Sequence, residues 1–163
     1  MKELIEFIKT HDKVKPSTLQ IILTYPGFKA IYYYKIANFF SRHKMNLIAN
    51  MITFRARKKT GIEIAPKATL GKNIFIDHGF GVVIGEDAVI GDNVIIYQGV
   101  TLGAKGTEKV GEKRHPTIGN NVIIGANSII LGHIKVGDNS IIGAGSVILH
   151  DVNENSTVIQ KRR

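Results

Sequence analysis

A six-residue spacing of aliphatic residues runs through most of the chain after Gly61. Near the C-terminal end it holds without error at Ile118, Ile124, Ile130, Val136, Ile142 and Ile148. Earlier, with one two-residue slip, it is carried by Ile64, Leu70, Ile76, Ile84, Ile90, Ile96 and Leu102. A glycine often follows the aliphatic residue, and a small or β-branched residue stands four places after it. An internal repeat of this kind constrains the fold more strongly than any single motif.

Six residues are too few for a pair of helix turns or a hairpin blade. They suit a short strand followed by a bend, where Gly or Asn supplies the unusual backbone dihedrals. Three such units complete one coil, and stacked coils bring their aliphatic residues into a continuous column. The spacing therefore predicts a mainly β protein, with stacked coils of short strands over residues 61–163.

The first 60 residues show helical spacing instead, so we expect a short α-helical N-terminal region over 1–60 that contacts other copies in an oligomer. This region holds 12 Lys/Arg against 3 Asp/Glu, whereas residues 61–163 hold 10 of each. All of the net charge of +9 thus belongs to the helical region. Such a region can attract phosphates, nucleic acid or anionic lipid, or it can be a solvated face that keeps an oligomer soluble.

Several classes of protein are disfavoured by composition. The chain has no cysteine, which excludes disulfides and thiolate metal sites. No segment approaches the roughly 18 apolar residues of a membrane span. The N-terminal stretch MKELIEFIKTHDK carries acids and lacks an apolar core, so it does not read as a secretory signal. We therefore expect a cytoplasmic protein that does not bind membranes.

The repeat breaks twice, and function in a solenoid is expected where the repeat breaks. The first break is the slip near residues 77–83, which contains Asp77 and His78. The second is the glycine- and lysine-rich segment 104–117, which should protrude as a loop and which ends just after His115.

The motifs at these breaks point to a family. The repeat resembles the hexapeptide pattern of proteins that form left-handed parallel β-helices. FIDHGFG (75–81), YQGVTLGAKG (97–106) and KRHPTIG (113–119), in this order, resemble the serine acetyltransferase family, and residues 11–31 are similar to the end of its N-terminal helical region. The resemblance implies transfer of an acetyl group from acetyl-CoA to the hydroxyl of L-serine, giving O-acetylserine and CoA for cysteine biosynthesis.

The resemblance also implies residue roles. His78 corresponds to the catalytic base and Glu63 to the carboxylate that orients it. Neutral imidazole, with a pKa of about 6.5, suits removal of a hydroxyl proton at neutral pH. Glu63 precedes His78 by fifteen residues, three short of a coil, so contact between them requires the corner to fold back. Arg114 and His115 correspond to substrate-binding positions, where the planar guanidinium suits a carboxylate.

Further substrate and coenzyme positions follow by the same correspondence. Asp77 and Asp12 match acids that can receive the substrate ammonium, Asp12 from the helical region. Residues bordering the coenzyme A arm or its thioester end are Gly103, Ala104, Ala126 and Ala144. Acetyl-CoA is expected as cosubstrate, and no metal is expected.

Assembly and partners are also expectations from the resemblance. A homotrimer with active sites between neighbouring prisms is expected, a hexamer is possible, and nucleic acid is not expected as a partner. The chain departs from the usual family pattern at Ala65 and Ala104. It also ends where relatives continue into the tail that contacts O-acetylserine sulfhydrylase, so no complex of that kind is expected.

Three alternatives remain open. The nearest is an acetyltransferase of this fold acting on another hydroxyl, such as that of homoserine or a sugar. A second is a zinc hydratase resembling the gamma-type carbonic anhydrases, which needs three histidines, two of them close in sequence. The smallest gap between histidines here is 17 residues, from His133 to His150. A third is a non-catalytic scaffold or nucleic-acid binder using the basic helices.

Overall fold

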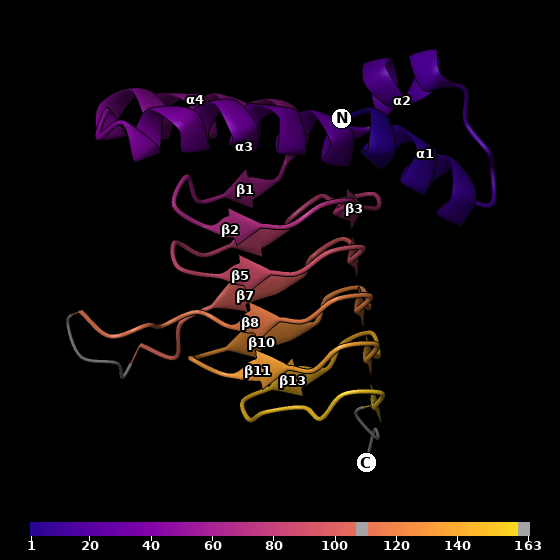
Figure 1. Ribbon diagram of the computed structural model, residues 1–163, viewed down its shortest axis with the longest axis vertical. Coiled ribbons are helices and arrows are strands. Elements are labelled where there is room, and N and C mark those ends of the chain that lie inside the picture. Colours follow the sequence, from indigo (N-terminus) through magenta and orange to yellow (C-terminus); the bar gives the residue numbers. More distant parts are fainter. Residues whose placement is uncertain (107–110, 160–163) are drawn as a thin grey trace.

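The computed structural model describes residues 1–106 and 111–159. Within them, four helices lie at one end of the molecule and a stack of short strands forms the rest (Figure 1). The helices are α1 (Lys2–His11), α2 (Thr18–Thr24), α3 (Pro26–Arg42) and α4 (Asn46–Thr60). Ser17 caps α2 by accepting a hydrogen bond from the Gln20 N–H (3.2 Å), and Gly61 ends α4 in the left-handed conformation with φ of 71°.

The strands are only two or three residues long, as a six-residue unit requires. They are β1 (Glu63–Ile64), β2 (Thr69–Leu70), β3 (Phe75–Ile76), β4 (Val83–Ile84), β5 (Val89–Ile90), β6 (Ile95–Ile96), β7 (Thr101–Gly103), β8 (Thr117–Ile118), β9 (Ile123–Ile124), β10 (Ile129–Leu131), β11 (Lys135–Val136), β12 (Ile141–Ile142), β13 (Val147–Ile148) and β14 (Thr157–Val158).

Three parallel sheets form the faces of the stack. Sheet A contains β1, β4, β7, β10 and β13, sheet B contains β2, β5, β8 and β11, and sheet C contains β3, β6, β9, β12 and β14. The chain visits sheets A, B and C in turn and then returns to A one coil further along (Figure 1). The predicted left-handed parallel β-helix after a helical N-terminal region is confirmed.

The strand register shows how the two breaks are accommodated. Val83 pairs with Thr101, eighteen residues on, as three six-residue units require. Glu63 pairs with Val83, twenty residues on, because of the two-residue slip. Thr101 pairs with Ile129, twenty-eight residues on, because of the long segment after β7. Both breaks therefore leave the strand pairing intact and displace only the connecting segments.

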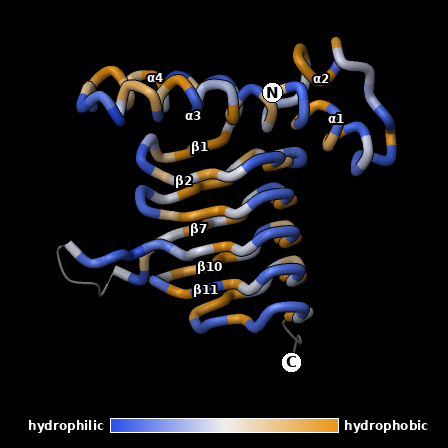
Figure 2. Tube along the Cα trace, viewed as in Figure 1, coloured by the Kyte–Doolittle hydropathy of each residue, from blue (hydrophilic) through white to orange (hydrophobic). Residues whose placement is uncertain are grey.

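The core is the column of aliphatic residues that the spacing predicts. Ile84, Leu102 and Ile130, on successive strands of sheet A, are 0–1% exposed. Buried serines at the bends have hydrogen-bond partners: Ser128 Oγ donates to the Gly143 carbonyl (3.0 Å) and Ser140 Oγ to the Asn153 carbonyl (2.8 Å). Figure 2 shows hydrophobic segments along the strands and hydrophilic segments at the bends. Burial of these stacked rows is the main stabilising contribution to the fold.

The helices form a cap on the first coil. Gly27 of α3 lies against the Ile76 carbonyl of β3, where a Cβ would stand 2.1 Å from the oxygen. Tyr34 of α3 donates from its hydroxyl to the Ala68 carbonyl (2.7 Å). These contacts attach the helical region to the end of the stack. Among the residues that the structure describes, none of the helices combines the length and the apolar character of a membrane span.

The segment between β7 and β8 leaves the stack, as the second break predicts (Figure 1). At its start, Lys105 Nζ donates to the Leu149 carbonyl (2.7 Å), two coils further along. Thr117, which the sequence places in the loop, already belongs to β8. Residues 107–110 of the expected loop lie outside the described residues.

Candidate functional site

His78 lies in the connection from β3 to β4, on the edge between sheets C and A. This connection has six residues, whereas the corresponding connections on later coils have four. Its backbone is unusual, with positive φ at His78 (57°), Gly79 (72°) and Gly81 (78°). The two additional residues make the turn bulge, and the His78 side chain is 75% exposed.

The same turn folds back onto the start of the β-helix. The Gly81 N–H donates to the Gly61 carbonyl (2.9 Å), and the Glu63 N–H donates to the Val82 carbonyl (2.9 Å). A Cβ on Gly79 would stand 2.5 Å from Cδ1 of Ile62, so only glycine fits there without a shift. The corner therefore brings the His78 turn beside the segment that carries Glu63, although the two residues are separated by three residues fewer than a regular coil contains.

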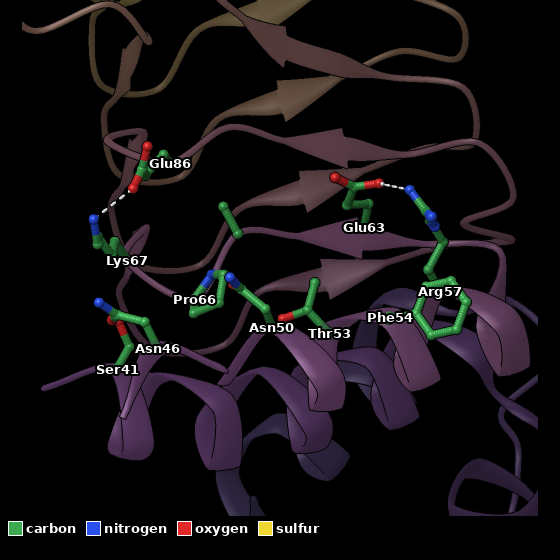
Figure 3. Close-up of a pocket in the computed structure, with 11 residues that line it drawn as sticks. Ser41, Asn46, Asn50, Thr53, Phe54, Arg57, Glu63, Pro66, Lys67 and Glu86 are labelled. Atoms are coloured by element: carbon green, nitrogen blue, oxygen red, sulfur yellow. Dashed lines mark hydrogen bonds and ion pairs between the residues drawn. The ribbon is translucent and has the colours of Figure 1, made fainter. Parts of the chain in front are cut away.

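Glu63 itself is directed elsewhere. Its Oε2 accepts a hydrogen bond from Nη1 of Arg57, at the end of α4, over 2.7 Å (Figure 3). The pair lines a cleft of about 520 Å³ between α4 and the first coil. The described residues contain no hydrogen bond between Glu63 and His78.

Two acids of the predicted substrate site lie near a tyrosine. Tyr25, between α2 and α3, donates from its hydroxyl to Oδ2 of Asp12 over 2.5 Å. Burial, then the hydrogen bond to Asp12 and the charges of Asp12 and Asp77, raise the pKa of Tyr25 to about 12. The Oδ1 of Asp12 accepts from the Val14 N–H (2.8 Å). Asp77 lies 3.9 Å from Nε2 of His78, measured from its Oδ1. Asp12, Tyr25, Asp77 and His78 thus form one group, the acidic edge.

A second group lies on the other side of sheet A, on the edge between sheets A and B. His115 is buried, with its Nδ1 2.5 Å from Oδ1 of Asp87. The ring covers Gly85, where a Cβ would stand 2.1 Å from Nε2. Asp87 also accepts hydrogen bonds from the backbone N–H groups of Arg114 (2.9 Å) and His115 (2.8 Å). Asp87, Arg114 and His115 are called the basic edge below.

Electrostatics of the basic edge follow from these contacts. Burial opposes ionisation of Asp87, but the hydrogen bonds from Arg114 and His115 outweigh it and lower the pKa of Asp87. The short contact with a carboxylate assigns the Nδ1 proton to the Asp87 side and leaves Nε2 as the acceptor. The Arg114 guanidinium is half exposed and lies 3.9 Å from Oε2 of Glu86, whose Oε1 lies 2.6 Å from Nζ of Lys67.

The predicted coenzyme positions occupy both edges. Ala126 and Ala144 stand one above the other on the edge between sheets C and A, where the Gly145 N–H donates to the Ala126 carbonyl (2.8 Å). They continue the edge that begins with His78. Gly103 ends β7, and Ala104 follows it on the way to the basic edge.

Sheet A separates the acidic edge from the basic edge. Crossing it takes about four residues, or about 13 Å at 3.3 Å per residue. A free amino acid is shorter than this separation of the backbones, which favours a site shared between the acidic edge of one copy and the basic edge of another.

Comparison with known proteins gives a consistent result. Models of the bacterial transferase hexapeptide (six repeats) and of the hexapeptide repeat of succinyl-transferase match residues 115–150 and 81–106. Serine acetyltransferase of Staphylococcus epidermidis is 51% identical over 135 residues, covering 83% of this chain and 62% of that protein. Serine acetyltransferase of Staphylococcus aureus is 48% identical over 159 residues, covering 98% of this chain and 74% of that protein.

The chain belongs to the serine acetyltransferase family. The solved structure of Neisseria gonorrhoeae serine acetyltransferase in complex with serine superimposes with a TM-score of 0.92 at 37% identity, covering 98% of this chain and 65% of that one. The chain spans somewhat under two thirds of the length of several of these family members.

Two residues of these groups, Tyr25 and Asp87, are not identified by the sequence alone. Tyr25 precedes Pro26 and Gly27, and nothing in the spacing connects it with Asp12. Asp87 is detectable in principle, because Val89 pairs with Thr117 and the same register sets Asp87 opposite His115. That register depends on the length of the protruding segment, which the repeat does not supply. Within the described residues, no three His, Asp or Glu side chains gather as a metal site would require.

Proposed function

We propose that the protein transfers the acetyl group of acetyl-CoA to the hydroxyl of L-serine, giving O-acetylserine and CoA. The observation that carries the proposal is the pair of edges on either side of sheet A, one acidic with an open histidine and one basic with a fixed histidine. Their chemistry is that of a zwitterion-binding site beside a general base. The complex of the gonococcal family member with serine supports the choice of acceptor.

In the proposed reaction, His78 removes the proton of the serine hydroxyl as that oxygen attacks the thioester carbonyl. The C–S bond then breaks, and the proton taken by the imidazole passes to the CoA sulfur. Direct attack requires no nucleophile on the protein. Removal of the proton by a positioned base contributes a rate enhancement of about 10²–10⁴-fold. The exposed ring at a left-handed turn leaves both nitrogens accessible to substrate and orienting carboxylate.

Glu63 is assigned the orienting role, because the turn carrying His78 is hydrogen-bonded to residues 61 and 63. A carboxylate on the far nitrogen would select the tautomer and stabilise the imidazolium that forms. In the structure this carboxylate points to Arg57, so the role requires it to share its oxygens between Arg57 and His78. Only Oε2 is engaged by the guanidinium, which leaves Oε1 for this contact.

Serine is held by opposite charges at its two ends. Asp12 and Asp77 receive the ammonium, the Arg114 guanidinium receives the carboxylate, and Nε2 of His115 accepts a hydrogen bond from the serine hydroxyl or ammonium. Since the two edges lie about 13 Å apart in one copy, the site forms between copies. In a closed ring of three copies, a single kind of interface places the acidic edge of each copy against the basic edge of its neighbour. The outward face of sheet A, with Val83, Ile129 and Val147 each 37–47% exposed, then faces the ring axis.

Acetyl-CoA is assigned to the groove between the copies. Its arm runs along the edge that carries Ala126 and Ala144, below His78, where small side chains let a ligand approach the backbone. Gly103 and Ala104 lie at the thioester end, at the base of the protruding segment.

A thiol-release assay with purified protein, acetyl-CoA and a panel of acceptors tests the proposal. L-serine should be the preferred acceptor by kcat/KM over L-homoserine and simple sugars. Preference for homoserine or a sugar would assign the chain to a different acceptor on the same fold. Absence of CoA release with every acceptor would reject the enzyme activity.

A further inference from the structure

The helical cap carries a groove that the proposed reaction does not use. It lies between α2, α3 and the end of α4, has a volume of about 410 Å³, and is lined by Ile22, Phe28, Lys29, Tyr32, Tyr33 and Lys59. None of these residues is acidic. The groove therefore combines an apolar floor with two ammonium groups.

Aliphatic side chains stand exposed beside the groove. On α2, Leu19, Ile22 and Leu23 are 66%, 41% and 58% exposed, and Tyr32 of α3 is 53% exposed. α2 lies at the end of the molecule opposite the last coil, and Figure 2 shows hydrophobic stretches there. Large aliphatic residues clustered in this way on one short helix indicate a surface that is covered by another apolar phase.

The charge around the groove has one sign. No acidic residue occurs from Lys13 to Ile62, a stretch with ten Lys and Arg. A hydrogen bond from Lys59 lowers the pKa of Tyr33, and the charges of Lys59 and Arg55 act in the same direction. Desolvation of the Tyr33 hydroxyl opposes this shift but is outweighed. Lys29 is held in place by donating from Nζ to the Leu23 carbonyl at the end of α2 (2.6 Å).

These features distinguish between possible occupants. A second copy of the cap would bring two faces of the same strong positive charge together, which opposes self-association. Nucleic acid would satisfy the cations but not the exposed leucines, since it offers bases for aromatic stacking rather than hydrocarbon. A bilayer containing anionic lipid supplies both a negative surface and hydrocarbon for the leucines.

We propose that this face of the cap, formed by the groove and by Leu19 and Leu23, docks on anionic lipid bilayers. Lys29 and Lys59 meet the phosphate groups, and the leucines of α2 enter the boundary between headgroups and acyl chains. This proposal departs from the expectation from composition that the protein does not bind membranes, and it is independent of the acetyltransferase activity.

The test is flotation of the whole protein with vesicles of phosphatidylcholine alone and of phosphatidylcholine with 30% phosphatidylglycerol. Binding should require phosphatidylglycerol and should weaken as salt rises from low to high. The double variant Lys29→Gln/Lys59→Gln should lower the apparent affinity by about thirtyfold, at about fivefold for each lysine. The double variant Leu19→Ser/Leu23→Ser should lower the apparent affinity for the vesicles at high salt, where the electrostatic attraction to the lipid is screened.

A matched control removes the same charge from the β-helix, as Lys72→Gln/Lys135→Gln. It should bind as the unmodified protein does. Equal loss in this control would show that net charge alone is responsible, and would overturn the proposed face. So would binding that is equal with and without phosphatidylglycerol, or leucine variants that bind normally. A light-scattering mass in which pairs of assemblies associate through the cap, abolished by Leu19→Ser/Leu23→Ser, would identify a second copy as the occupant instead.

Discussion

The two edges of sheet A hold their histidines in opposite ways. On the acidic edge the His78 side chain is 75% exposed, and the nearest carboxylate oxygen, from Asp77, is 3.9 Å from its Nε2. On the basic edge the His115 side chain is 10% exposed, and its Nδ1 lies 2.5 Å from Asp87. One imidazole is fixed by its own chain, and the other is left open.

This difference matches the different tasks proposed for the two rings. A fixed imidazole has one tautomer and a defined acceptor nitrogen, which suits holding a substrate group. An open imidazole can exchange a proton and be oriented when a substrate and a neighbouring copy arrive. The comparison teaches that His115 is held by contacts within one copy, whereas the proposed role of His78 needs contacts that a substrate and a neighbouring copy would supply.

The largest effect should follow from removing the open ring. His78→Ala should lower kcat by about 10²–10⁴-fold, because the hydroxyl proton then has no positioned acceptor. Steady-state rates with L-serine and acetyl-CoA measure this. The control is His133→Ala, another exposed histidine, which lies between β10 and β11. A near-normal rate in His78→Ala would show that the open edge is not the catalytic one.

The basic edge should affect substrate binding rather than turnover. Arg114→Ala should raise the KM for serine by about 10–100-fold, the value of a hydrogen bond to a charged group, and leave the KM for acetyl-CoA nearly unchanged. Equal increases in both constants would move Arg114 to the coenzyme.

The same two variants test whether the edges meet between copies. Inactive His78→Ala and weak Arg114→Ala chains, unfolded together and refolded as mixed assemblies, should regain activity at low serine. In a ring with one kind of interface, roughly one site in four receives both intact edges. No recovery in verified mixed assemblies would place both edges in one copy and contradict the comparison.

The fold could be predicted because its signal is repeated. Each six-residue unit independently indicates a strand and a bend. An irregular unit, such as the slip before Val83, therefore does not prevent prediction of the other units. The helical region carries no such redundancy. At residues 24–27, for example, Pro and Gly are residues typical of a turn, yet only Tyr25 lies outside a helix, because Pro26 starts α3 where its missing N–H is harmless.

The candidate site was predictable only in part. Spacing and resemblance single out His78, Asp77, Arg114 and His115 as candidates, because these residues stand at interruptions of the repeat. Asp87 and Tyr25 stand in ordinary short connections between regular elements, and their importance comes from contacts with residues 28 and 13 positions away in sequence. Such contacts depend on how long connections fold back, which local pattern does not encode.

Acid should loosen the basic edge. Hydrogen bonds lower the pKa of Asp87 from its usual 3.8, so its ionised form stabilises the folded state. That stabilisation is fully present above the usual value and is lost as pH falls through the lower pKa of the folded state. Asp87→Asn should therefore cost about 1–2 kcal/mol of unfolding free energy at pH 7.

The pH dependence separates this from a general packing defect. The difference in melting temperature between Asp87→Asn and the unmodified protein should shrink as pH is lowered below about 4. A difference that is constant with pH would mean that the Asp87 charge does not support His115.

The smallest effect should come from the hydroxyl that holds the acidic edge. Tyr25 donates to Oδ2 of Asp12, and its pKa of about 12 keeps that proton in place at neutral pH. In Tyr25→Phe, Asp12 keeps only the Val14 N–H and can rotate away from the substrate ammonium. We expect the KM for serine to rise about fivefold, the value of one hydrogen bond, with the KM for acetyl-CoA unchanged. The matched control is Tyr34→Phe, another tyrosine of the cap, which loses a hydroxyl hydrogen bond of 2.7 Å to the Ala68 carbonyl of the first coil. That variant should lower stability without changing the KM for serine, and an equal KM effect in both would assign the role of Tyr25 to folding of the cap rather than to the acidic edge.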